Sequence, residues 1–316
     1  MKLSVVILTY NQQQYICQAL DSVLMQNVDF EYEIVVGDDC SQDNTPVILR
    51  EYAERFPNRF NLLLNRQNVG ISKNYQNVLY ACQGEYIALL EGDDYWTDKN
   101  KLQKSVDFLD SHPDYGFVGA YNNILYADNR IEKDEYDYLP SCKLEGMWEL
   151  CGDVFEYAKY GPVTRTVTIC FRNSIIKPYI QYVGIGTDIV LQTILAHSSK
   201  FAKCKEVWAV YRQGGVSTTQ TDYEKTLYYT KWYVANKLLQ KQLFPQECNW
   251  NEDELADKVI YVQLKHAVRK LHICEARRLH NAIKSTMYKN KSYYKFSNNV
   301  FLCTVAGIAT KIRVIK

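Results

Sequence analysis

The stretch Glu85-Tyr-Ile-Ala-Leu-Leu-Glu-Gly-Asp-Asp-Tyr-Trp96 decides the fold class of this chain. The length of its apolar part fits a β-strand. The apolar residues are continuous rather than alternating, which indicates a strand that is buried on both faces, as in parallel sheets covered by helices. Three carboxylates, Glu91, Asp93 and Asp94, follow where the apolar run ends. Carboxylates this close repel one another, and a hard divalent cation held by carboxylate and phosphate oxygens relieves the repulsion. The stretch therefore predicts a buried strand that ends in a metal site.

A plainer interpretation is an acidic turn that caps a following helix, which Thr97 would begin. A second acidic strand end argues against it, because the strand-like residues 34–36 run into Asp38 and Asp39. Residues 3–11 form a third apolar run that ends in hydrogen-bonding side chains. Ligands of open parallel sheets gather beyond the carboxyl ends of the strands, so we expect the three ends to form one site.

Strand-like and helix-like patterns alternate up to residue 121. This alternation predicts an α/β fold, with a mostly parallel sheet that is flanked by helices on both sides. The chain from residue 223 is helical by pattern. Its length and its 47% of hydrophobic residues suffice for one large domain and an appendage, which we place at residues 1–221 and 222–316.

The net charge of +1 conceals an asymmetry between these two parts. Residues 1–221 contain 20 Lys and Arg against 28 Asp and Glu, whereas residues 222–316 contain 17 against 8. From Lys258 onward there are 13 basic residues against one acid, and residues 300–309 form an apolar run. A basic helical segment with an apolar strip favours binding at an anionic membrane interface. The alternative is an appendage that packs on the catalytic domain with a solvated basic face.

The first strand starts by Leu3, so we expect no targeting leader and a cytoplasmic location. The run at residues 300–309 is half the length that a membrane-spanning helix needs. Ten cysteines without a C-x-x-C pair indicate reduced, mostly buried thiols rather than a disulfide framework or a zinc site. We expect no nucleic-acid partner, because no recognised fold for that function is present.

Four segments in this order resemble family 2 glycosyltransferases with the GT-A fold. They are S-V-V-I-L-T-Y-N (4–11), V-V-G-D-D-C-S-Q-D-N-T (35–45), N-V-G-I-S-K-N (68–74) and Y-I-A-L-L-E-G-D-D-Y-W (86–96). The resemblance covers roughly residues 2–215. It implies a nucleotide-sugar half (1–121), an acceptor half (122–221) and transfer of a sugar from a nucleotide diphosphate, with UDP favoured, to an acceptor hydroxyl.

A dinucleotide-type phosphate site is absent from the sequence. No G-x-G-x-x-G follows the first strand, and no G-x-x-x-x-G-K-[ST] occurs. The diphosphate must then be neutralised by a cation, for which we expect Mn²⁺ or Mg²⁺ on Glu91, Asp93 and Asp94. Glu91 stands where the family often has aspartate. The resemblance implies donor binding by Thr9, Tyr10, Asn11, Asp38, Asp39, Asn68, Gly70, Lys73, Asn74, Asp93 and Arg212.

The resemblance also assigns the catalytic base to Asp188, where a glycine-containing loop turns into an apolar helix. The alternative is that Thr187 or Asp188 only caps that helix. Arg212 is expected on the diphosphate or in a structural ion pair, and Lys73 on the donor or in solvent. Gln213 stands where related sequences often have a histidine, which predicts fewer protein ligands for the metal.

Residues 121–182 are rich in tyrosine and acids, which suits an acceptor saccharide, free or linked to a lipid, although aromatic residues are equally ordinary in a core. One rival function is a sugar-1-phosphate nucleotidyltransferase, which should have a glycine-rich, lysine-containing loop after its first strand. Thr9-Tyr10-Asn11 is not such a loop. Another rival is an inactive carbohydrate-binding scaffold of the same fold, against which the retained acids argue.

Overall fold

The structure is a computed structural model that describes residues 1–134, 139, 142–183, 187–213, 222–270, 272–289, 291 and 294. It contains two compact units, Met1–Ser217 and Thr218–Lys316. The first unit is built around one eleven-stranded sheet, with the main strand order β3-β2-β1-β4-β10-β6-β11-β9-β8. The second unit is helical, as the sequence predicts.

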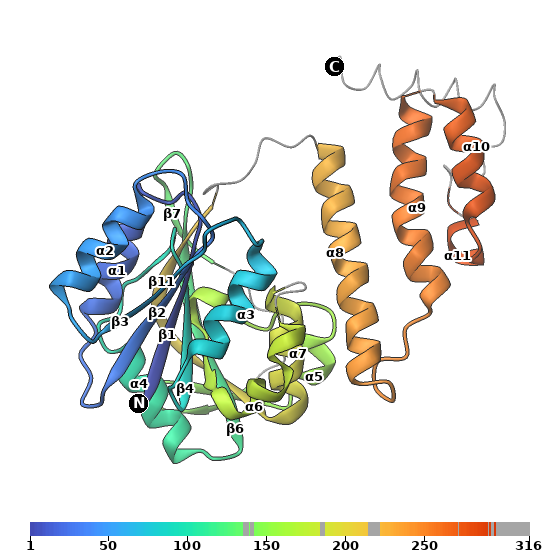
Figure 1. The fold of residues 1–316 in the computed structure, drawn as a ribbon. Coiled ribbons are helices and arrows are strands. Elements are labelled where there is room, and N and C mark those ends of the chain that lie inside the picture. Colours follow the sequence, from blue (N-terminus) through green and yellow to red (C-terminus); the bar gives the residue numbers. More distant parts are fainter. Residues whose placement is uncertain are drawn as a thin grey trace. The chain divides into compact units, whose positions relative to one another are not determined.

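Four parallel strands form one half of the sheet (Figure 1). Strand β1 pairs with β2 on one side and with β4 on the other, and its register places Thr9 opposite Asp38 and Leu8 opposite Glu91. The predicted meeting of three polar strand ends at one edge of the sheet is therefore confirmed. The strands are β1 (Leu3–Thr9), β2 (Tyr32–Asp38), β3 (Phe60–Leu64) and β4 (Tyr86–Glu91).

The other half of the sheet is mixed. Strands β6 and β11 are parallel, but β10 is antiparallel to both β4 and β6, and the remaining pairs are also antiparallel. Part of this half is a hairpin, which joins strands without a helical crossover and so makes them antiparallel. These strands are β5 (Tyr95–Trp96), β6 (Tyr115–Leu125), β7 (Ile131–Lys133), β8 (Lys143–Glu145), β9 (Trp148–Gly152), β10 (Cys170–Arg172) and β11 (Lys200–Arg212).

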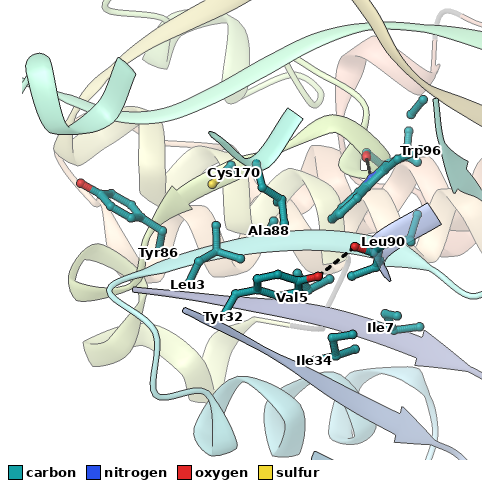
Figure 2. Packing of buried hydrophobic residues seen from close by; sticks show 14 of the residues in the cluster. Leu3, Val5, Ile7, Tyr32, Ile34, Tyr86, Ala88, Leu90, Trp96 and Cys170 are labelled. Atoms are coloured by element: carbon teal, nitrogen blue, oxygen red, sulfur yellow. Dashed lines mark hydrogen bonds between the residues drawn. The ribbon is translucent and has the colours of Figure 1, made fainter. Parts of the chain in front are cut away.

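Helices cover both faces of the parallel half, as predicted (Figure 1). Alternate residues of β1, namely Leu3, Val5 and Ile7, belong to one buried cluster with apolar residues of α1, α2 and α4. Figure 2 shows this packing, with Tyr32 and Trp96 donating hydrogen bonds to backbone carbonyls. Helix α3 packs on the opposite face. The helices are α1 (Ile16–Leu24), α2 (Thr45–Arg55), α3 (Ile71–Ala81) and α4 (Lys101–Ser111).

The start of α4 differs from the sequence prediction. The helix begins at Lys101, after Asn100, rather than at Thr97, because Thr97 and its neighbours are used elsewhere. The backbone N–H of Thr97 donates to the carbonyl of Trp208, and the Asp98 carboxylate accepts from the backbone N–H of Asn100. The short strand β5 thus separates the acidic turn from the helix.

The remaining helices of the first unit lie between β9 and β11. Helix α7 is apolar along most of its length, and its first described turn starts at Thr187, as the sequence predicts. It packs against α5 and α6. These helices are α5 (Phe155–Ala158), η1 (Thr166–Thr168), α6 (Asn173–Ile176), η2 (Lys177–Tyr182) and α7 (Thr187–Ser198).

The second unit has a small core of its own, in which Leu264, Val268 and Leu279 are buried between α9 and α10. The buried Asp257 carboxylate accepts from the backbone N–H groups of Lys284 and Ser285 and so ties the segment before α11 to α9. In the part of the chain that the structure describes, none of the helices has the length and apolar character that crossing a bilayer requires. The helices are α8 (Asp222–Leu243), α9 (Glu252–Arg269), α10 (Ile273–Ala282) and α11 (Thr286–Lys289).

Candidate functional site

The end of β2 is a carboxylate pair that is surrounded by donors. Asp38 is buried and accepts from the backbone N–H and the hydroxyl of Ser41. Asp39 is also buried, and its two oxygens accept from the backbone N–H groups of Val69 (2.8 Å) and Gly70 (2.9 Å). Hydrogen bonds to an ionised carboxylate stabilise the charged form. These two acids therefore hold the loop after β2 and the entry to α3 in place.

The segment before α3 wraps around Asp39. Gly70 has a φ of 82°, a left-handed conformation that costs glycine little, and it precedes the first residue of the helix. Asn68 donates to the Asp39 carbonyl oxygen at 3.2 Å. Asn74 is buried and donates to the Gly37 carbonyl at 2.8 Å, so it joins α3 to β2. Asn74 is thus part of the scaffold, whereas Lys73 on the same turn is exposed.

The end of β1 offers unsatisfied oxygens and an exposed ring. Thr9 Oγ1 and Gln12 Oε1 are buried and have no hydrogen-bond partner among the residues that the structure describes. Tyr10 is 40% exposed, so one of its faces is open to a ligand. Asn11 has a φ of 52° and is held by Ser41 and by the backbone N–H of Gln42. Buried polar atoms without partners are rare and mark a place where a ligand or an ion completes the hydrogen bonds.

The end of β4 brings the acidic turn against these atoms. The backbone N–H of Gly92 donates to the Leu8 carbonyl at 2.9 Å. A Cβ at Gly92 would lie 2.3 Å from Gln12 Oε1, so only glycine allows this approach without a shift. Burial raises the pKa of Asp93, while Arg212 and Gln12 act in the opposite direction. Burial raises the pKa of Asp94 well above its usual value, and the charges of Glu91 and Asp93 add to this effect.

Arg212, at the end of β11, holds this turn in place. Its backbone N–H donates to Asp94 Oδ1 at 2.7 Å, and its Nε donates to the Asp93 carbonyl at 2.8 Å. A third bond joins the guanidinium to Gln18 Oε1, and the group lies over the ring of Tyr15. A structural ion pair, the alternative considered for Arg212, is not seen among the described residues. In the described part of the chain, no carboxylate therefore lies within ion-pair distance of the Arg212 guanidinium.

A divalent cation suits this edge of the sheet, but with few protein ligands. Within the described residues, no three His, Cys, Asp or Glu side chains converge in a way that could hold a metal. The predicted set of three carboxylates is thus not assembled, and Asp94 is directed to the backbone of Arg212. Mg²⁺ and Mn²⁺ commonly use one or two carboxylates together with phosphate oxygens and water. Asp93 offers one carboxylate of this kind, and Thr9 Oγ1 is a buried oxygen without a hydrogen-bond partner among the described residues.

The side chain of Asp188 lies outside the described residues, although its backbone belongs to the first turn of α7. Gln192, one turn further on, is fully buried and described. Its Oε1 accepts from the backbone N–H groups of Val163 and Thr164, and its Nε2 donates to the Thr164 carbonyl. Because residues four apart share a helix face, this clamp fixes the loop at residues 161–164 beside the turn that bears Asp188.

That loop lines a pocket of about 510 Å³. Tyr157 and Tyr160 are 41% and 62% exposed beside it. Aromatic faces with an adjacent carboxylate match the apolar C–H faces and hydroxyl groups of sugars. The other lining residues are Leu139, Glu156, Gly161, Pro162 and Val163.

Sequence reasoning missed the glutamines of this site. Gln12 contributes a buried oxygen beside Gly92, Gln18 binds Arg212, and Gln192 clamps the loop at residues 161–164. The polar run that follows the first strand was a usable signal for Gln12.

The burial of Lys101 was also missed. It is fully buried with its Nζ 4.1 Å from the Trp96 ring centre, and burial lowers its pKa to about 8.

Comparison with known proteins agrees with this geometry. The sequence profile described as glycosyl transferase family 2 matches residues 4–170, which is more than half of the chain. An uncharacterized protein of Mycobacterium tuberculosis is 48% identical over 132 residues, which cover 42% of this chain and 38% of that protein.

Two named relatives are more distant. The putative teichuronic acid biosynthesis glycosyltransferase TuaG of Bacillus subtilis is 36% identical over 106 residues, which cover 34% of this chain and 41% of TuaG. The poly(ribitol-phosphate) beta-N-acetylglucosaminyltransferase TarS of Staphylococcus aureus is 37% identical over 118 residues, which cover 35% of this chain and 19% of TarS. The chain spans less than half the length of these curated relatives.

Solved structures confirm the fold. Residues 1–349 of Staphylococcus aureus TarS, in complex with UDP-GlcNAc, align with a TM-score of 0.57 and 17% identity, which cover 98% of this chain and 89% of that chain. The mannosyltransferase PcManGT of Pyrobaculum calidifontis, in complex with GDP-Man and Mn²⁺, aligns with a TM-score of 0.51 and 16% identity, which cover 97% of this chain and 87% of that chain. At these identities the likeness concerns the fold.

Proposed function

The chain belongs to glycosyl transferase family 2, and on this premise we propose that it is an inverting enzyme that transfers a sugar from a UDP-sugar to an acceptor hydroxyl. We place the reaction in the synthesis of a polysaccharide or a glycolipid. One observation carries the proposal. The crowded acids at the end of β4, two with raised pKa values, face the unsatisfied oxygens of Thr9 and Gln12. This edge needs a cation and hydrogen-bonding partners, and a nucleotide diphosphate with its metal provides both.

The donor lies across the ends of β1, β2 and β4 in this proposal. Tyr10 stacks on the base, because its ring is exposed beside the strand end. Asp39 accepts from the base N–H with the lone pair that Asn65, Val69 and Gly70 leave unused. Arg212 and the exposed Lys73 provide positive charge for the diphosphate. The solved complexes of TarS with UDP-GlcNAc and of PcManGT with GDP-Man support a nucleotide-sugar donor of this kind.

Asp93 and Thr9 are the residues that would hold Mn²⁺ or Mg²⁺. The ion, when bound, stabilises the negative charge of the leaving diphosphate. Asp94 positions the turn through its bond to the backbone of Arg212 and is not itself a ligand in this proposal. The absence of histidine at Gln213, which is exposed, leaves the remaining coordination positions to phosphate and water.

Asp188 is the proposed general base, which takes the proton of the acceptor hydroxyl as the new bond to the sugar forms. Its backbone lies in the first turn of α7, and a helix N-terminus favours negative charge, which suits a carboxylate that acts as a base. The acceptor saccharide stacks on Tyr157 and Tyr160 in the pocket that the Gln192 clamp fixes beside this turn.

Calorimetry of UDP binding tests the donor site. We expect UDP to bind more tightly with Mn²⁺ or Mg²⁺ than with EDTA. Equal affinity in the two solutions would contradict a metal bridge between Asp93 and the diphosphate. Release of UDP from UDP-sugars, with water as the acceptor, distinguishes the rivals. A nucleotidyltransferase consumes pyrophosphate instead, and an inactive scaffold binds the donor without turnover.

Replacement of Asp188 by Asn tests the base. Asn keeps the shape of the side chain but cannot accept the proton, so we expect turnover to fall by about 100- to 10,000-fold. UDP affinity should stay within about twofold, because Asp188 touches the acceptor rather than the donor. Asp29→Asn, at an exposed aspartate before β2 and outside the proposed sites, is the matched control. Turnover of Asp188→Asn at the level of the control would reduce Asp188 to a helix cap.

We also propose that the basic helices of the second unit contact an anionic membrane surface. Arg269, Lys270, Arg277 and Arg278 are exposed, while the apolar faces of α9 and α10 pack on each other. In this proposal the apolar run at residues 300–309 inserts into the membrane interface. These residues lie outside the described part of the chain. Each basic residue near an anionic surface contributes about 1 kcal/mol, and salt weakens the attraction. Sedimentation with phosphatidylglycerol vesicles at low and high salt tests this, and failure to bind at low salt would favour a purely packing role.

A further inference from the structure

A hairpin at the end of the sheet brings two cysteines together. Strands β8 and β9 are joined by the two-residue turn Gly146-Met147, where Gly146 has a φ of 59°. The register places Glu145 opposite Trp148 and Lys143 opposite Leu150. One step beyond, Cys142 stands opposite Cys151, and their Sγ atoms are 2.6 Å apart. A bond between the sulfurs would close a loop of ten residues, from 142 to 151.

The position of this pair in the ladder suits a disulfide. A β-turn hydrogen-bonds the residues at its two ends, so Glu145 and Trp148 form a hydrogen-bonded pair. Hydrogen-bonded and non-hydrogen-bonded pairs alternate along an antiparallel ladder, which makes Cys142 and Cys151 a non-hydrogen-bonded pair. Side chains of such pairs approach most closely, within the range of Cβ separations that disulfides require. Neither cysteine is buried, so a small oxidant reaches both.

These thiols depart from the sequence prediction of mostly buried cysteines. Among the nine cysteines that the structure describes, only Cys170, Cys204 and Cys248 are buried. The prediction relied on apolar neighbours in the sequence, and it could not include the register of a hairpin that a two-residue turn sets. The cysteines at 142 and 151 have eight residues between them in a polar and aromatic segment, which gives no C-x-x-C signal.

We propose that Cys142 and Cys151 are a reversible oxidation site that forms an intramolecular disulfide across the β8–β9 hairpin. The oxidant is hydrogen peroxide. The thiolate of one cysteine attacks a peroxide oxygen, which gives a sulfenic acid and releases water after protonation. The second thiol then displaces that hydroxyl, so that the S–S bond forms and a second water leaves. Two thiols and one peroxide thus become one disulfide and two waters, and a dithiol reductant reverses the step.

The bond would fasten a weak edge of the sheet. Strand β8 is the last strand in the order, it pairs over only three residues, and all three are exposed. Its partner β9 pairs with β11 and carries Trp148, which packs on Phe108 and Trp208. A covalent link between β8 and β9 therefore ties the edge strand to the packed part of the sheet. Cross-linking stabilises mainly by restricting the unfolded chain.

Peptide mapping of the full-length protein tests the site. Reduced protein is treated with hydrogen peroxide, residual thiols are blocked with N-ethylmaleimide, and the digest is analysed without reduction. We expect a peptide pair joined through Cys142 and Cys151, lower in mass by two hydrogens than the separate peptides. Dithiothreitol should restore both thiols. Labelling of both cysteines by N-ethylmaleimide after peroxide, or a sulfinic acid at either one without the link, would overturn the proposal.

Thermal unfolding of matched full-length variants tests the effect of the link. We expect peroxide to raise the Tm of the first unit in the wild-type protein by about 5 °C, since the cross-link closes a ten-residue loop. Cys142→Ser and Cys151→Ser should lose this rise. Cys274→Ser, which removes an exposed cysteine of the second unit, should retain it. A link without any rise in Tm would show that the disulfide does not fasten the edge strand, and a rise in both Ser variants would assign the effect to another residue.

Discussion

The carboxylates at the end of β2 accept hydrogen bonds from several donors, whereas those at the end of β4 crowd one another and have Arg212 as their main partner. Asp38 and Asp39 accept from Ser41, Val69 and Gly70. Asp93 and Asp94 have raised pKa values, with burial as the main cause, and Glu91 and Asp93 add charge repulsion at Asp94. Two acidic strand ends in register with the same central strand thus have different physical roles.

The difference separates anchoring of a loop from binding of a cation. At β2 the negative charge is balanced by backbone N–H groups of the protein itself, which fixes the loop that leads into α3. At β4 Arg212 compensates the charge only in part, because burial still raises the pKa values of Asp93 and Asp94. The uncompensated part favours a cation from outside, carried in with the donor. An acidic pair after a strand is therefore not enough to assign a metal ligand. The donors that the rest of the chain brings to it decide the role.

The largest expected effect comes from Asp93. Asp93→Asn removes the carboxylate proposed to hold the cation, so we expect Mn²⁺-dependent UDP affinity to fall about 100-fold, or about 2.7 kcal/mol. Calorimetry with Mn²⁺ and with EDTA measures it, and the variant should bind UDP almost equally in both. If Asp93→Asn kept the wild-type ratio of UDP affinities with Mn²⁺ and with EDTA, the end of β4 would not be the metal-binding end.

Asp39→Asn is the matched change at the other strand end. An amide in place of the carboxylate directs an NH₂ group at one of the two backbone N–H groups of Val69 and Gly70. A buried donor left without an acceptor costs about 2 kcal/mol, so we expect the free energy of unfolding to fall by that amount. The ratio of UDP affinities with and without Mn²⁺ should stay at the wild-type value. Urea unfolding measures the free energy of unfolding. If Asp39→Asn abolished the effect of Mn²⁺ on UDP affinity, the metal would belong at the end of β2 rather than β4.

Much of this edge was accessible from the sequence, and the part that was missed depends on long-range contacts. The apolar runs and their polar ends placed Thr9, Asp38 and Glu91 at one edge, because parallel strands align their carboxyl ends. No local pattern predicts that the backbone N–H groups of residues 69 and 70 donate to Asp39, or that the backbone N–H of Arg212 donates to Asp94. Both contacts join segments far apart in the chain, and their geometry follows from the completed sheet.

The same limit explains two local features that the sequence did not reveal, within a fold class that was predicted correctly. Short β10 enters the sheet antiparallel between β4 and β6, and no periodicity of three residues could reveal its direction. Thr97 resembles a helix cap locally, yet its N–H is used by the carbonyl of Trp208 on β11. A tertiary hydrogen bond overrides the local preference for capping in that case.

Glycines next to the two ends provide a third comparison. A Cβ at Gly37 would lie 2.4 Å from Val78 Cγ2 and 2.7 Å from Asn74 Oδ1, both buried on α3, so the helix must shift. Overpacking of this kind costs about 2 kcal/mol. A Cβ at Gly92 meets first the far end of the Gln12 side chain, and we expect Gly92→Ala to cost about 1 kcal/mol or less. Urea unfolding of both variants checks the order, and equal losses would mean that the β4 end is as rigid as the β2 end.

The smallest effect is a pH dependence at the end of β4. The pKa of Asp94 is raised by burial and by the charges of Glu91 and Asp93, so the folded chain keeps this proton at a pH where the unfolded chain has lost it. From about pH 4, the ordinary value of an aspartate, up to the raised pKa, the folded state binds more protons, and stability falls as the pH rises. Above the raised pKa the loss is complete and constant.

Asp94→Asn isolates this term, because the amide oxygen still accepts from the backbone N–H of Arg212 without carrying charge. In EDTA we expect wild type to lose, relative to Asp94→Asn, on the order of 1 kcal/mol of unfolding free energy between pH 4 and neutral pH. UDP with Mn²⁺ should shrink the difference, since a cation compensates the crowded charges. Paired urea titrations across this range measure it. An unchanged difference after addition of UDP and Mn²⁺ would mean that the ion does not bind where these charges meet, and the β4 end would then be an anchor like the β2 end.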